Sequence, residues 1–132
     1  MTPVVRWLLV PLTALAVWVG TLLIGIGASG LLDSLCPPEL MVSGLCTAPW
    51  HRPAMAAVEM ICAGIAAAGF IALPVRVAPA YRPQVAVACF VDGGLFTIQL
   101  AIAGAMWAPA VVAAAVGAIV LGRTITRARA CR

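Results

Sequence analysis

The chain has 132 residues, of which 64% are hydrophobic and only 9% are charged, whereas soluble domains average about 45–50% apolar and about 25% charged residues. A soluble domain of this length cannot hide so much apolar side chain, because small domains bury only about two-thirds of their surface. All basic residues are arginine and the net charge is +4, but the arginines sit at the ends of apolar runs, which indicates membrane topology and not a nucleic-acid surface. The composition predicts an integral membrane protein, and its arginine and alanine content is typical of a GC-rich bacterial genome.

Four apolar segments each approach the roughly 20 residues that a helix needs to cross about 30 Å of hydrocarbon. We expect an all-α, single-domain, four-helix transmembrane bundle with spans at residues 7–28, 54–73, 84–105 and 107–122. The first run is longer than the hydrophobic part of a signal peptide, so we expect it to be retained. Trp107 suits the membrane interface and Pro109 suits a first helical turn, so the last two spans should form a tight hairpin. A single bent, re-entrant segment is the alternative.

The arginines predict the orientation of the bundle. Arg6 precedes the first span, and basic residues also occupy the loop at residues 74–83 and the tail at residues 123–132. The loop at residues 29–53 has only Arg52, beside two acidic residues. The positive-inside rule therefore places both termini and the second loop in the cytoplasm, and the first loop in the periplasm or exterior of a plasma (inner) membrane.

The outward loop contains Cys36 and Cys46, ten positions apart. Thiols outside the cytoplasm are commonly oxidised, so a disulfide is expected to close this loop as a cap over the bundle. The same loop holds the chain's polar and aromatic docking candidates: Glu39, Trp50, His51 and Arg52.

Two alternatives give the loop a chemical role. Four-helix membrane oxidoreductases such as the vitamin K epoxide reductase-like proteins also carry exposed cysteines, but this chain lacks the C-x-x-C pair that makes their thiols exchange. Zinc could accept Cys36, Cys46 and His51 with Glu39 as a fourth ligand, but the spacing fits no compact pair of ligands, and oxidised cysteines do not ligate as thiolates. We predict no metal site.

Two carboxylates fall inside predicted spans, where a charge costs at least a few kcal/mol. Glu59 lies about 8 Å into the second span and Asp92 about 12 Å into the third, counted at about 1.5 Å per residue. Gln99 follows Asp92 by seven residues on the same helix face and is expected at the depth of Glu59, where the two could share a hydrogen bond. No basic residue lies within a span to neutralise either acid.

Asp92 has two interpretations. It could be a protonated polar contact between helices, or it could bind a cation, a proton or a cationic group of a partner. The Asp92-Gly93-Gly94 sequence invites a local break that would expose carbonyls beside the carboxylate. The small multidrug-resistance transporters are similar in size and helix number, but their carboxylate lies in the first helix, which has no charge here after Arg6.

Small residues recur every four positions, for example Gly64 and Ala68 or Ala113 and Gly117, and predict close helix packing. No nucleotide-binding loop, nucleophile elbow or metalloprotease motif is present, so the sequence favours a role that is not enzymatic and needs no cofactor. We expect an accessory or assembly subunit of a larger membrane complex, with a membrane-protein partner or further copies of itself around it. The alternatives are a small homo-oligomeric transporter or ion-conducting protein that uses Asp92 and Glu59, and a thiol- or quinone-linked oxidoreductase.

Overall fold

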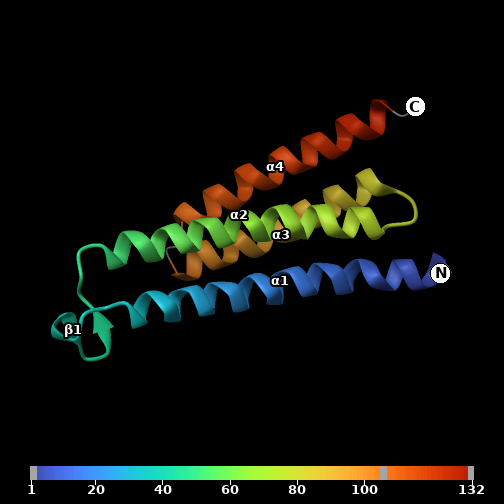
Figure 1. The fold of residues 1–132 in the computed structure, drawn as a ribbon. Helices are drawn as coiled ribbons and strands as arrows, with labels where there is room; N and C mark the ends of the chain where they lie inside the picture. Colours follow the sequence, from blue (N-terminus) through green and yellow to red (C-terminus); the bar gives the residue numbers. More distant parts are fainter. Residues whose placement is uncertain (1–2, 105–106, 131–132) are drawn as a thin grey trace.

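The computed structural model describes residues 3–104 and 107–130. Its elements are the helices α1 (Pro3–Ser34), α2 (His51–Val77), α3 (Arg82–Gly104) and α4 (Trp107–Ala130), the short 3-10 helix η1 (Pro38–Leu40), and the two-residue strands β1 (Met41–Val42) and β2 (Leu45–Cys46). All four long helices are long and apolar enough to cross a membrane. The chain is therefore organised as a multi-pass helical bundle (Figure 1).

The helices run up and down beside one another, with α2 in contact with each of the other three (Figure 1). The small hairpin lies at one end of the bundle, and the start of α1, the α2–α3 connection and the end of α4 lie at the other. We call these the hairpin end and the termini end. The prediction of separate third and fourth helices that pack together is confirmed, and Pro109 lies in the first turn of α4.

The helices extend beyond the spans expected from hydropathy. α1 continues to Ser34, so the 29–53 loop narrows to residues 35–50, and α4 continues through the basic segment to Ala130. A helix satisfies its own backbone hydrogen bonds, so it need not stop where the apolar run stops. Arg123, Arg127 and Arg129 thus lie on a helical extension of α4.

Small residues occupy many of the contacts between the helices, and many large apolar side chains point away from the bundle. The buried positions include Ala86 and Ala101 of α3, whereas Leu23 is 63% exposed and Ile102 is 70% exposed. This is the arrangement expected in lipid, where large apolar side chains can face outward at no cost and small ones let backbones approach. A β-carbon on Gly64 would contact valines of α4, and one on Gly117 would lie 3.2 Å from the Phe90 ring of α3. Both glycines lie at helix contacts, as their spacing predicted, and the contact at Gly117 is the tighter of the two.

At the termini end, two carbonyls in the last turn of α2 accept hydrogen bonds, one from α1 and one from the helix's own C-cap residue. The Nε–H of Arg6 donates to the carbonyl of Val77 at 3.2 Å, and the N–H of Ala78 donates to the carbonyl of Pro74 at 2.9 Å. Arg6 thus binds the carboxyl end of α2, where exposed carbonyls carry partial negative charge.

Candidate functional site: the outer surface of the bundle

The predicted disulfide between Cys36 and Cys46 is present, with the two α-carbons 6.0 Å apart. It joins the chain just after α1 to the end of β2, and the hairpin between β1 and β2 lies inside the ring that it closes. Ser43 and Gly44, between the strands, have φ values of +52° and +80°. Positive φ at both residues is what a tight two-residue hairpin needs, and glycine meets it without steric cost. The loop is a compact cap.

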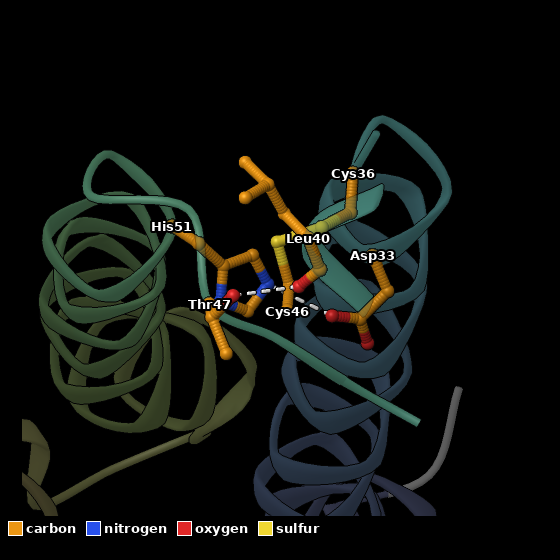
Figure 2. Close-up of a disulfide and its surroundings, with 6 residues drawn as sticks. All are labelled: Asp33, Cys36, Leu40, Cys46, Thr47 and His51. Carbon is orange, nitrogen blue, oxygen red and sulfur yellow. Dashed lines mark hydrogen bonds and ion pairs between the residues drawn. A yellow bond between two sulfur atoms is a disulfide. The ribbon is translucent and has the colours of Figure 1, made fainter. Parts of the chain in front are cut away.

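A polar contact joins the two helices under this cap. His51 Nε2, at the start of α2, lies 2.8 Å from the carboxylate oxygen Oδ1 of Asp33, in the last turn of α1 (Figure 2). The imidazole of His51 is 11% exposed and the Asp33 side chain is 54% exposed. Sequence analysis missed this pair. The contact could have been predicted, because Asp33 and His51 flank the two cysteines, and a disulfide between those cysteines brings the two helix ends together.

A second contact closes the cap. The hydroxyl and the backbone N–H of Thr47 both donate to the carbonyl of Leu40, at 2.7 and 2.9 Å (Figure 2). Leu40 belongs to η1, so this carbonyl ties the start of the cap to its end. Together with the disulfide and the hairpin, it leaves the segment between α1 and α2 little conformational freedom.

The docking candidates lie on the surface of the hairpin end. Glu39 and Arg52 are exposed, and Trp50 is 40% exposed with its ring centroid 5.8 Å from that of His51. His51 differs from the other three, because its imidazole is turned toward Asp33. The exposed aromatic and charged groups of a stiff cap form a surface that a partner can bind with little loss of entropy.

The zinc alternative is contradicted. Cys36 and Cys46 are joined to each other, so neither offers a thiolate. Within the described residues, no group of three or more His, Cys, Asp and Glu side chains is placed to hold a metal ion.

The three intramembrane candidates Asp92, Gln99 and Glu59 are all exposed on the outside of the bundle. Asp92 lies near the middle of α3, ten residues from its start and twelve from its end. Among the residues described, no polar or charged side chain is buried. The polar groups expected at contacts inside the bundle therefore lie on its surface.

The expected hydrogen bond between Glu59 and Gln99 is not formed among the side-chain bonds of the described residues. The helix register explains why. The ring of Phe70 on α2 packs 3.5 Å from where a β-carbon on Gly93 of α3 would lie. Gln99, six residues farther along α3, is then level with Gly64, and Glu59 lies five residues beyond, about 7.5 Å nearer the hairpin end.

The glycine pair after Asp92 does not interrupt the helix. α3 is continuous from Arg82 to Gly104, and the hydroxyl of Thr97 donates to the carbonyl of Gly93 at 2.6 Å. The expected break with free carbonyls beside Asp92 is therefore not found. Gly93 lies at a helix contact instead, where a β-carbon would be in ordinary van der Waals contact with the Phe70 ring.

Asp92 and Glu59 do not form one site. By the same register, Asp92 is level with Ile71 of α2, twelve residues from Glu59 and about 18 Å away along the bundle. Two shallow hollows on the described surface, both beside Pro83 and Gln84 at the termini end, touch neither carboxylate. What remains as the candidate site is the outward face of α3 with Asp92 and Gln99, together with the disulfide-closed cap.

Comparison with known proteins identified no relative, so the fold and the site are interpreted from their own geometry. No protein-family model matches this sequence, no curated protein is significantly similar to it, and no solved structure matches its fold.

Proposed function

We propose that this protein is a small polytopic accessory or assembly subunit of a larger membrane complex, in which its helix faces and its outer cap are the contact surfaces. The observation that carries the proposal is the position of Asp92 and Gln99, which are exposed on the outside of a bundle whose described residues bury no polar side chain. A protein that worked through its own interior would be expected to keep its polar groups there.

The energetics of lipid favour a protein contact at α3. A carboxylate near the middle of a span costs at least a few kcal/mol when it faces hydrocarbon. A neighbouring transmembrane helix that offers a hydrogen-bond donor or a positive charge removes that cost. Contact between the Asp92 face of α3 and another protein helix is therefore more favourable than contact between that face and lipid.

The cap supports the same role from the hairpin end. It is stiffened by the Cys36–Cys46 disulfide and presents Glu39, Trp50 and Arg52 to its surroundings. We place this end in the periplasm or exterior of a plasma (inner) membrane, because the arginines gather at the opposite end, in keeping with the positive-inside rule.

The first test is purification from native membranes in a mild detergent, followed by native mass spectrometry. The accessory role predicts a different protein at fixed stoichiometry. Asp92→Asn should keep that partner, because the amide still makes hydrogen bonds, and Asp92→Leu should lose it. Ile119→Leu, on an exposed part of α4, is the control that should change nothing. Recovery of this chain alone, from membranes in which the variants behave alike, would overturn the proposal.

A homo-oligomeric transporter is the second candidate, and the exposure of Asp92 favours it, because further copies could enclose the carboxylate between them. The separation of about 18 Å between Asp92 and Glu59 means that one ion does not bridge the two acids. A transporter predicts that Asp92→Asn abolishes proton-coupled uptake in proteoliposomes while insertion is unchanged. Wild-type flux from Asp92→Asn would rule this candidate out.

A further inference from the structure

The outward face of α3 carries a regular row of exposed residues. Its members are spaced alternately four and three positions apart: Ala88, Asp92, Leu95, Gln99 and Ile102. This is the spacing of a heptad seam, in which two helices cross at a small left-handed angle and each side chain fits between those of its neighbour.

The row lies opposite the packing face of α3. That face is marked by Gly93, against Phe70 of α2, and by Phe90, against Gly117 of α4, and at its side Phe96 meets Trp18 of α1 with ring centroids 6.0 Å apart. At about 100° per residue, Leu95 lies roughly 200° from Gly93 and about 140° from Phe90 around the helix. A second helix can therefore approach the row without displacing α2 or α4.

We propose that α3 pairs along this row with α3 of a second copy of the chain, in parallel, about a two-fold axis normal to the membrane. This rests on the proposed function in one respect, that α3 is a protein contact. The pairing proposal adds that the helix bound to α3 belongs to a second copy of the same protein, so two copies would enter the complex together.

The polar residues of the row can pair with the same residues of an identical helix. In a parallel two-fold pair each residue lies opposite its own copy, so Gln99 meets Gln99. An amide both donates and accepts, and the two can satisfy each other. Asp92 meets Asp92, and two adjacent carboxyls can share one proton as a carboxylic acid–carboxylate hydrogen bond. No basic residue lies within the apolar ranges 7–28, 54–73, 84–105 and 107–122, so a second copy has none at this depth to pair with Asp92. Polar residues at such seam positions are known to fix register and favour two-stranded pairing.

Cysteine cross-linking in native membranes tests this pairing. The background carries Cys62, Cys89 and Cys131 replaced by alanine and keeps the Cys36–Cys46 disulfide. Leu95→Cys, on the row, should give an oxidised species of twice the chain's mass on a non-reducing gel. Leu100→Cys is the matched control, since Leu100 is also exposed and lies about 140° from Leu95 around α3. It should remain monomeric.

Variants of the two polar residues test whether their hydrogen bonds stabilise the dimer. In the Leu95→Cys background, Gln99→Leu should reduce the dimer about threefold, the usual size of one hydrogen bond between helices in lipid. Asp92→Asn should preserve it, because two amides also pair, and Asp92→Arg should abolish it by placing two charges together. Retention of the Cys36–Cys46 disulfide and of the detergent melting temperature shows that each variant is folded.

The outcomes separate this inference from the proposed function. A dimer through Leu95→Cys with no other protein in native membranes supports the pairing and overturns the accessory role. An adduct of Leu95→Cys with a different protein overturns the pairing and leaves the accessory role standing. Equal cross-linking at Leu95→Cys and Leu100→Cys, or none at either, also overturns the pairing.

Discussion

The methyl carbon Cγ1 of Val17 lies 2.9 Å from the position that a β-carbon on Gly69 would occupy. α1 and α2 therefore touch at a point where only hydrogen fits on the α2 side. Valine is held in one rotamer in a helix, so it cannot turn aside to admit a methyl group. This contact fixes how closely the first helix lies against the second.

Gly69→Ala should destabilise the bundle by about 1–3 kcal/mol, because the added methyl group overpacks this contact. The midpoint of thermal or denaturant unfolding in detergent measures the change. Gly20→Ala is the control, since a β-carbon at Gly20 meets nothing within 4 Å, and it should be neutral or slightly stabilising.

Val17→Ala should rescue Gly69→Ala, because it removes the methyl groups with which the new side chain collides. The double variant should be more stable than Gly69→Ala alone, a coupling that a double-mutant cycle measures directly. Additive losses would mean that Gly69 acts through something other than its contact with Val17.

Replacement of Cys36 and Cys46 by serine should cost about 2–3 kcal/mol, the loop-closure entropy of a short ring. Incubation of the wild type with a reductant should lower the unfolding midpoint by a similar amount. Cys62→Ala is the matched control, because that thiol is free and its loss leaves the cap intact. If the unfolding midpoint is the same with and without reductant, the disulfide does not stabilise the bundle.

The Asp33–His51 pair should contribute less than about 1 kcal/mol, because Asp33 is largely in solvent, which screens the interaction. A cycle of Asp33→Asn, His51→Gln and the double variant, compared at low and high salt, measures the coupling energy. We expect a coupling that shrinks as salt rises. A coupling that is large and insensitive to salt would mean that the pair is shielded from water by a partner.

Membrane orientation can be read from two engineered cysteines in a background with Cys62, Cys89 and Cys131 replaced by alanine. Ser43→Cys, in the hairpin, should react with a membrane-impermeant maleimide added to intact cells. Ala80→Cys, in the α2–α3 connection, should react only after the membrane is opened. Reversed labelling would contradict the orientation inferred from the arginines.

Much of the architecture follows from local chemistry. Four long apolar runs predict four helices long enough to span a membrane, because lipid offers no partner for backbone N–H and C=O groups outside a helix or a closed barrel. The Cys36–Cys46 pair was also predictable, since both residues fall in one short loop. Helix ends were less so, and α1 and α4 both run past their apolar segments.

Which way each helix face points was decided only by the tertiary structure. The sequence placed Asp92 and Gln99 on one face of a helix. It did not reveal that this face is outward, or that Gln99 and Glu59 lie about 7.5 Å apart along the bundle. In water, an apolar stripe identifies the buried side of a helix. In lipid both sides are apolar, so the facing is set by shape, as where Gly69 admits Val17 of α1 and Gly117 packs tightly against Phe90 of α3.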